Sequence, residues 1–323
     1  MRIVFMGTPA LAAQTLEAVA AEHEIVLVAT QPDRPAGRRH ELQAPPVKQW
    51  ALEHGIAVAQ PERARDAEFI ARVRDVRPEA IVVVAFGQIL PQDILDMPRE
   101  FYPHGTCVNL HYSLLPRWRG AAPVQRAIEH GDHVTGVSTQ HMAAKLDAGD
   151  LILSEQIEIG AEETSAELFE RLVPLGTKVL LETLQLVAKG EAPRVPQNDA
   201  QATLAPSIKA EETKLDWHEP AEYLAHQIHA FNPRPGTVTT FRDKPLKVWR
   251  ARPVKSTFHG ESGLIQFTDN RVLVKTGNPS QEQYKGDSGE ALELIEVQAA
   301  GKARMNAADW ARGVRLEMGE SLM

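Results

Sequence analysis

The chain has 323 residues, of which 43% are hydrophobic and 24% charged, and its formal net charge is -8. This composition is typical of a folded protein with room for two domains, and it excludes a disordered tail. One cysteine excludes an internal disulfide framework and a multi-cysteine metal site, and no stretch approaches the roughly 20 apolar residues that span a bilayer.

The first half of the chain alternates apolar β-rich runs with helical segments. Strands are predicted at residues 2–7, 25–30, 80–86 and 107–110, and helices at residues 11–21 and 121–129. These runs are apolar on both faces, as in parallel strands that are covered by helices on each side. We therefore expect an α/β fold with an open, mostly parallel, Rossmann-like sheet, whose ligands bind beyond the carboxyl ends of the strands. The apolar run at the start is too short for a secretory signal, so we expect a cytoplasmic protein.

The second half begins with a strong helix and then changes pattern. The helix is predicted at residues 165–189, with Thr164 or Ser165 as cap, Glu167 in the first turn and Gly190 at its end. Residues 190–207 carry three prolines and read as a linker. A helix at 220–230 and short strand-like runs at 237–241, 246–250, 264–267, 271–274 and 292–297 follow. They predict a small antiparallel, OB-like β-barrel over residues 208–323.

The segment after the fourth strand carries side chains suited to acyl-transfer chemistry. Asn109 and His111 are two residues apart on a strand and therefore point to the same side. An amide can donate to a developing oxyanion, and an imidazole exchanges protons near neutral pH. Asp147 lies in a glycine-containing turn, and a carboxylate that faced His111 would orient it and stabilise its charged form. The alternatives are a loop cap for the first pair and a structural turn residue for Asp147.

Other patterns do not support a cofactor or metal site. The turn Gly7-Thr8-Pro9 after the first strand lacks G-x-G-x-x-G, so nicotinamide binding is not favoured. Five histidines between residues 104 and 141 form no metal-ligand pair such as H-E-x-x-H. Cys107 is expected to pack in the sheet rather than to act as a nucleophile.

Several motifs together resemble a known family, the folate-dependent formyltransferases. The run NLHYSLLPRWRGAAPVQRAI, residues 109–128, resembles the signature of that family. Residues 4–19, 30–38, 44–51 and 85–95 resemble its methionyl-tRNA formyltransferase branch, and so do residues 208–217 and 228–251 in the second half. The resemblance therefore runs from the first strand to about residue 252, and the last seventy or so residues are less diagnostic.

The resemblance implies an activity and a set of site residues. Asn109, His111 and Asp147 match the family's Asn-His-Asp catalytic set. The implied donor is 10-formyltetrahydrofolate, without a metal, and the implied acceptor is the α-amine of methionyl initiator tRNA. Asn109 and protonated His111 would hold the oxyanion, and Asp147 would keep His111 charged. The folate is expected at two loops, formed by Phe86, Gly87, Gln88, Ile89 and Leu90 and by Ser113, Leu114, Leu115 and Pro116.

The resemblance also assigns a role to each predicted domain. Residues 1–189 would be the catalytic domain, 190–207 the linker and 208–323 a tRNA-binding barrel. Six basic residues and one acidic residue lie between positions 242 and 255 and would form a basic stripe, and a proline- and glycine-rich loop carries further arginines. The expected tRNA contacts are Arg34, Arg38, Arg39, Lys244, Lys247 and Arg250. The alternative is a solvated strand face and an ordinary polar loop. We expect a monomer.

Departures from the family pattern and rival functions stay open at this point. Tyr112 stands where the family usually has a small residue, and Ala143 and Ala144 stand where the family usually carries an acidic residue after Met142. The loop lacks part of the usual basic run and reads Arg-His-Glu at residues 39–41. A sugar-nucleotide N-formyltransferase has a similar catalytic domain, and a formyltetrahydrofolate hydrolase would use water in place of the amine. A glycinamide ribonucleotide formyltransferase would end near the linker, and a non-catalytic folate- or RNA-binding protein would not need the Asn-His-Asp set.

Overall fold

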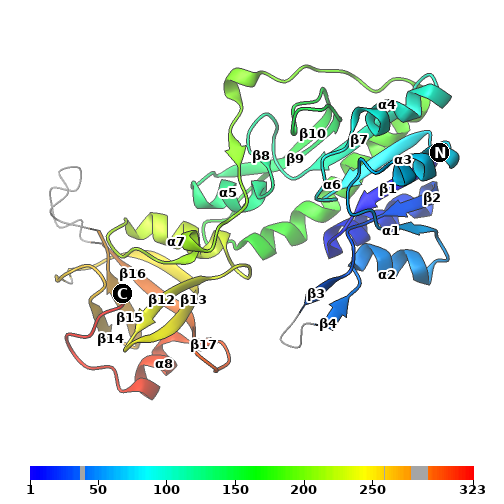
Figure 1. Ribbon diagram of the computed structural model, residues 1–323. Coiled ribbons are helices and arrows are strands. Elements are labelled where there is room, and N and C mark those ends of the chain that lie inside the picture. Colours follow the sequence, from blue (N-terminus) through cyan, green and yellow to red (C-terminus); the bar gives the residue numbers. More distant parts are fainter. Residues whose placement is uncertain (37–40, 258, 278–289) are drawn as a thin grey trace. The chain divides into compact units, whose positions relative to one another are not determined.

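The computed structural model describes residues 1–36, 41–257, 259–277 and 290–323, which divide into two compact units (Figure 1). Unit 1 comprises residues 1–120, 135–157 and 170–205, and unit 2 comprises residues 121–134, 158–169 and 206–323. Each unit is therefore built from three separate stretches of the chain. Within the described residues, we find no helix with the length and apolar character that crossing a membrane requires.

A seven-stranded sheet forms the centre of unit 1. Its strand order is β10-β9-β7-β6-β1-β2-β5. The strands are β1 (Arg2–Gly7), β2 (Glu24–Ala29), β5 (Val58–Ala59), β6 (Ala80–Val84), β7 (Thr106–His111), β9 (Val134–His141) and β10 (Leu151–Glu158). The pairs from β5 to β7 are all parallel, and β9 runs antiparallel to β7. The predicted open, mostly parallel sheet is thus confirmed, and its strand order reverses between β1 and β6, where ligands bind in such folds.

Helices cover both faces of this sheet, and its central strands β1, β6 and β7 are accordingly buried on both sides. Val4 and Met6 of β1 pack in one cluster with Phe69 and Ile94, from α3 (Ala67–Asp75) and α4 (Gln92–Phe101). On the opposite face, α1 (Ala10–Glu22) and α6 (Ser165–Lys189) are joined by a hydroxyl contact of 3.2 Å between Thr15 and Thr177. Helix α2 (Pro46–Glu53) packs beside α1.

Helix α6 begins and ends where the sequence predicts. The Thr164 backbone amide donates to Glu167 Oε2 at 2.9 Å, and the Glu167 amide donates back to Thr164 Oγ1 at 3.4 Å. This reciprocal capping box satisfies two of the free amides of the first turn. At the other end, Gly190 has φ of +73°, a left-handed conformation that stops the helix without strain.

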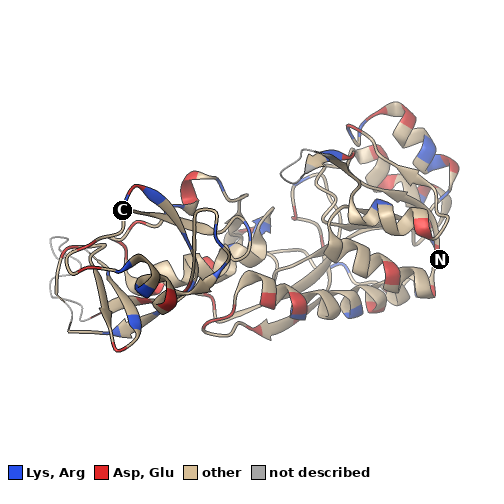
Figure 2. Cartoon of the chain, turned by 90° about the horizontal axis from the view of Figure 1, so that it is seen from below, with Lys and Arg blue, Asp and Glu red and all other residues tan. Residues whose placement is uncertain are grey.

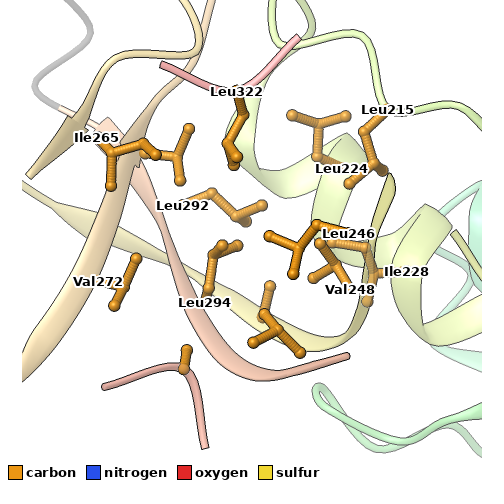
Figure 3. Packing of buried hydrophobic residues seen from close by; sticks show 14 of the residues in the cluster. Leu215, Leu224, Ile228, Leu246, Val248, Ile265, Val272, Leu292, Leu294 and Leu322 are labelled. Atoms are coloured by element: carbon orange, nitrogen blue, oxygen red, sulfur yellow. The ribbon is translucent and has the colours of Figure 1, made fainter. Parts of the chain in front are cut away.

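An antiparallel sheet forms the core of unit 2. Its main strand order is β12-β13-β16-β15-β14, with β17 paired to β16. The strands are β12 (Thr237–Phe241), β13 (Lys244–Lys255), β14 (Ile265–Thr268), β15 (Arg271–Lys275), β16 (Glu290–Ala299) and β17 (Met305–Asn306). Leucines, isoleucines and valines from the strands pack against α7 (Ala221–Ala230), as Figure 3 shows, and the same cluster includes residues of α8 (Ala307–Val314). Helix α5 (Pro123–Glu129) packs on α7.

The two edges of this sheet are joined by residues 320–323. Thr240 of β12 exchanges two backbone hydrogen bonds with Met323, of 2.7 and 3.0 Å. The Leu322 amide donates to the Gly263 carbonyl at 2.8 Å, just before β14. A short closing segment therefore pairs with both sides, which gives the closed antiparallel sheet expected of a small barrel.

Several short elements were not predicted from the sequence, and two of them lie near the candidate site that is described below. Strands β3 (Arg34–Ala36) and β4 (Glu41–Gln43) form a small hairpin in unit 1. Strand β8 (Arg119–Gly120) pairs in parallel with β11 (Leu204–Ala205). The 3-10 turns η1 (Asp199–Gln201) and η2 (Glu211–Thr213) flank β11. Much of the segment interpreted as a linker therefore packs within unit 1.

Candidate active site

Two of the residues expected to carry chemistry lie at the carboxyl end of β7. Asn109 and His111 are on the same side of this strand and are only 8% and 6% exposed. Polar side chains are seldom so well buried unless their hydrogen-bonding groups are used. Their partners come from two other segments of unit 1.

The third residue, Asp147, lies in the turn between β9 and β10. Its φ is +47°, a left-handed conformation that aspartate adopts more readily than most residues. Asp147 Oδ1 lies 3.4 Å from Asn109 Nδ2, and Oδ2 lies 3.8 Å from His111 Nδ1. The Gly120 amide donates to Oδ2 at 2.9 Å. The structure thus brings together the three side chains of the predicted catalytic set, from positions far apart in the sequence.

The hydrogen bond of His111 to the backbone decides which ring nitrogen is available. Nε2 lies 2.9 Å from the Trp118 carbonyl oxygen, and because a carbonyl only accepts, Nε2 must carry the hydrogen. Among the described residues Nδ1 has no hydrogen-bond partner, and it faces the carboxylate of Asp147. The neutral imidazole can therefore accept a proton at Nδ1, and the adjacent carboxylate would stabilise the resulting cation.

Two glutamines that the sequence analysis did not select complete this cluster. Gln140 Nε2 donates to Asp147 Oδ1 at 3.2 Å. Gln197 Nε2 donates to the Asp147 carbonyl at 2.9 Å. Neither stands in a recognisable motif. Gln140 is the direct cross-strand neighbour of Asn109, and that antiparallel register is visible only in the folded chain.

The first expected folate loop lies where the strand order of the sheet reverses. The Thr8 hydroxyl and Gln31 Nε2 both donate to the Phe86 carbonyl, at 3.1 and 3.0 Å. Gly87 has φ of +84°, which favours glycine, and Ile89 is 78% exposed. The Gln88 side chain holds the loop from within, because it accepts from the Ala64 amide and donates to the Pro61 carbonyl. Phe86 and Leu90 are buried, so Ile89 and the backbone beside it are what a ligand can reach.

The second expected folate loop, residues 113–116, is tied down by its own hydrogen bonds. The Ser113 hydroxyl donates to the Arg117 carbonyl at 2.6 Å. Ser138 of β9 donates to the Ser113 carbonyl at 2.8 Å and accepts from the Leu115 amide at 3.2 Å. Ser113 and Leu115 are buried, whereas Leu114 and Pro116 are half-buried. The Ser113 hydroxyl is thus occupied by a hydrogen bond within the protein. The loop can therefore contribute to a ligand site through its shape rather than through this hydroxyl.

Of the basic residues expected to contact tRNA in unit 1, only Arg34 can be examined. Its side chain is exposed and lies 3.5 Å from Glu62, a surface pair that contributes little to stability. Arg38 and Arg39 lie outside the described residues. Asp33, next to Arg34, has its pKa lowered by hydrogen bonds from Lys48 and Gln60.

The basic residues of β13 in unit 2 are partly paired. Arg250 forms an ion pair with Glu167. Burial would raise the pKa of Glu167, but hydrogen bonds from Thr164 and Arg250 lower it to about 2. Lys247 Nζ lies 5.0 Å from the centre of the Trp249 ring, and Lys244 begins the strand. Arg252 on the same strand pairs with Glu293, so the predicted basic stripe is partly neutralised, and Figure 2 shows basic (blue) and acidic (red) positions interspersed in the part of the chain near the C-terminus.

Two residues near the site, Cys107 and Tyr112, are buried. Cys107 on β7 is buried, and burial raises the pKa of its thiol, so it packs in the sheet as predicted. Tyr112, one of the departures from the family pattern, is 6% exposed, and burial raises its pKa to about 12. Its ring contacts α6 beside Gly176 rather than the cluster around Asp147. The described residues contain no group of three His, Cys, Asp or Glu side chains that could hold a metal ion.

Comparison with known protein families defines the class of enzyme to which this fold and site belong. Residues 1–184 match the family model described as formyl transferase, and residues 207–315 match the formyl transferase C-terminal domain. These two matches, together with the cluster of amide, imidazole and carboxylate side chains at the edge of the sheet, define the chain as a formyl-group transferase.

Full-length relatives narrow this class. The chain is 44% identical to a methionyl-tRNA formyltransferase of Moorella thermoacetica, over 100% of this chain and 99% of the relative. It is 43% identical to a methionyl-tRNA formyltransferase of Solibacter usitatus, over 100% and 98% of the two chains. The chain belongs to the methionyl-tRNA formyltransferase family, which confirms the resemblance found in its motifs.

A solved structure supports the same fold at low sequence identity. The N-formyltransferase from Helicobacter canadensis, in complex with folinic acid and dTDP-3-aminofucose, matches with a TM-score of 0.62 and 15% identity. The match covers 92% of this chain and 98% of that one. At this identity the likeness concerns the arrangement of the chain and not the acceptor.

Proposed function

We propose that this enzyme transfers the formyl group of 10-formyltetrahydrofolate to the α-amine of methionyl initiator tRNA, for translation initiation. The observation that carries the chemistry is the cluster of Asn109, His111 and Asp147 at the edge of the sheet. Methionyl-tRNA as the acceptor is supported by relatives that are named for it and match the whole chain. Folate as the donor is supported by the folinic acid in the Helicobacter structure.

The cluster supplies what the transfer of a formyl group needs. As the amine attacks the formyl carbon, negative charge develops on the formyl oxygen, and Asn109 would hold it, together with His111 once its ring has taken up a proton and become charged. One such donor typically contributes about 3 kcal/mol to lowering the barrier. The amine has to lose a proton, which His111 Nδ1 can accept and later return to the folate nitrogen that leaves. Asp147 would stabilise the charged ring between these two steps.

The two expected folate loops support a site for the donor next to this cluster. The loop of residues 86–90 lies at the point where the strand order reverses, with its backbone shaped by Gly87. A pterin edge needs alternating donors and acceptors, which exposed backbone supplies. The loop of residues 113–116 follows His111 directly and would line the rest of the folate site.

The two halves of the chain are proposed to divide the work. Residues 1–189 would carry the chemistry, 190–207 would connect, and 208–323 would bind tRNA. Arg34, Arg38 and Arg39 would contact tRNA from the first half, and Lys244, Lys247 and Arg250 from the second. Because phosphate contacts are electrostatic, binding through them should weaken steeply with salt. We further propose a cytoplasmic monomer, and sedimentation of the purified protein tests the oligomeric state directly.

The decisive experiment compares acceptors. Formyl transfer from 10-formyltetrahydrofolate is measured with methionyl initiator tRNA, elongator methionyl-tRNA, an amino-sugar nucleotide, and buffer alone. Rapid transfer confined to the initiator tRNA is expected. Transfer to the sugar nucleotide instead would replace the acceptor, and formate release in buffer at the same rate would make the enzyme a hydrolase.

A further inference from the structure

Gln140 ties together the two ends of the turn that carries Asp147. The side chain is buried, 2% exposed, and stands opposite Asn109 in the register between β7 and β9. Its Nε2 donates to Asp147 Oδ1 at 3.2 Å, and its Oε1 accepts from the Gly149 amide at 3.0 Å. One amide group therefore fixes both the carboxylate and the backbone two residues further on.

Gln197 holds the same turn from the segment that follows α6. Its Nε2 lies 2.9 Å from the Asp147 carbonyl and 2.8 Å from the Gly149 carbonyl. Its Oε1 accepts two bonds from Arg119, at 3.1 and 2.8 Å. Because an arginine only donates, the oxygen of this amide must face Arg119 and its nitrogen must face the turn.

Arg119 anchors this arrangement to the rest of unit 1. It is 4% exposed, and its Nη1 lies 2.8 Å from Asp199 Oδ1. Hydrogen bonds from Lys145 and Arg119 lower the pKa of Asp199, so the anchor is charged at neutral pH. Arg119 also precedes Gly120, whose amide donates to the Asp147 carboxylate. The contacts of Asp147 thus belong to one connected network.

The turn needs such support because its own backbone does little to fix it. Asp147 is held in a left-handed conformation, which costs on the order of 1 kcal/mol or more for a residue with a side chain. Among the described residues, a backbone hydrogen bond of 2.9 Å from the His141 amide to the Asp150 carbonyl closes the base of the turn, and inside it the Ala148 amide donates to Lys145 at 3.3 Å. Without the two glutamines, the carboxylate would keep only the Gly120 amide and the longer contact with Asn109 as donors.

We propose that Gln140 and Gln197 are positioning residues that hold the Asp147 carboxylate in the geometry needed for proton transfer at His111. The segment of residues 190–207 is then part of the active site as well as a connection. This inference rests on the proposed function, since it assigns Asp147 a role in the formyl transfer. It concerns how the turn is held and not which acceptor is used.

The test uses one substitution at each of the two glutamines. Gln197→Glu keeps the size and the oxygen that accepts from Arg119, but it replaces the donor by an oxygen facing two carbonyls. Gln140→Met keeps the approximate size and removes the hydrogen bonds of this side chain to Asp147, Gly149 and Gln197. The matched control is Gln201→Glu, the same change in the same segment at an exposed side chain. All variants are compared with the wild type by circular dichroism and thermal unfolding.

A misplacement of about 1 Å at a reacting group can cost on the order of 100-fold in rate. We expect kcat to fall about 100-fold in Gln197→Glu and in Gln140→Met, with KM for both substrates within twofold, and no change in Gln201→Glu. Amide hydrogen exchange of residues 143–151 should rise in the first two variants alone. A role limited to supporting Arg119 predicts the opposite for Gln197→Glu, since a carboxylate would pair with the guanidinium more strongly.

Failure of the positioning role and failure of the proposed formyl transfer give different results in these experiments. If folded Gln197→Glu and Gln140→Met both keep kcat within threefold of wild type, the positioning role is wrong although the enzyme still formylates tRNA. If the wild type does not formylate tRNA, the proposed function fails, and hydrogen exchange still decides whether the glutamines hold the turn. Unchanged exchange in both variants would overturn the inference whatever the activity.

Discussion

Replacing Asp147 by Asn tests the charge that the cluster relies on. The two side chains have the same shape, and the new amide would keep an oxygen to accept from the Gly120 amide. The change removes the negative charge and also the oxygen that accepts from Asn109 and Gln140. In the wild type this charge lies 3.8 Å from His111 Nδ1, with the carboxylate side chain 12% exposed. At an effective dielectric constant of about 20, a pair of unit charges at this distance interacts by about 4 kcal/mol.

This interaction exists only while His111 is charged, which is the state formed during proton transfer. Its loss should therefore appear in kcat and not in KM, as a decrease on the order of 1000-fold. The assay is single-turnover formyl transfer to methionyl initiator tRNA, with tRNA and folate binding measured separately. Asp150→Asn is the matched control, because Asp150 lies three residues away and pairs at the surface with Arg194. A folded Asp147→Asn enzyme with kcat within tenfold of wild type would refute the reasoning.

Three further predictions concern stability and binding. Burial lowers the pKa of His229 to about 4, so the unfolded chain takes up a proton first and stability falls as pH drops from 6.5 toward 4. In urea unfolding, wild type should lose about 1 kcal/mol more than His229→Gln between pH 7.5 and 5.5, and equal losses would contradict this. Lys247→Ala should weaken tRNA binding and reduce its logarithmic salt slope by about 1, whereas Lys178→Ala, at a lysine paired with Glu155, should not. Gly149→Ala would place a methyl group 1.7 Å from the His141 carbonyl, so activity and melting temperature should both fall sharply; a normal melting temperature would show that the turn adapts.

The sequence predicts those helices and strands whose own residues, through their hydrophobic pattern or their capping residues, already match their place in the folded protein. The parallel strands were visible because they are apolar on both faces, and α6 was visible because Thr164, Glu167 and Gly190 mark its ends. Strands β9 and β10 were missed. The first contains a glycine and several polar residues, and the second alternates between buried and exposed positions. Their place in the sheet depends on pairing partners that are distant in the sequence.

The candidate site was predictable only in part, for a related reason. Asn109 and His111 are marked by their spacing on a strand, and Asp147 by its glycine-containing turn. The family resemblance joins these three, and the structure places them within reach of one another. Gln140 and Gln197 carry no such mark, because one depends on antiparallel register and the other on the return of a proline-rich segment to unit 1.

The segment that joins both edges of the sheet in unit 2 also bears on how the protein folds as it is made. The Thr239 hydroxyl bonds to the Met323 carbonyl across 84 positions of sequence, and β14 gains its neighbour at residues 320–322 in the same way. A nascent chain that has not yet released these residues from the ribosome exposes two unpaired strand edges. Such edges invite pairing with other chains. Unit 2 can therefore complete its sheet only after residue 323 has left the ribosome, whereas the central strands of unit 1, from β1 to β7, are available once residue 111 has done so.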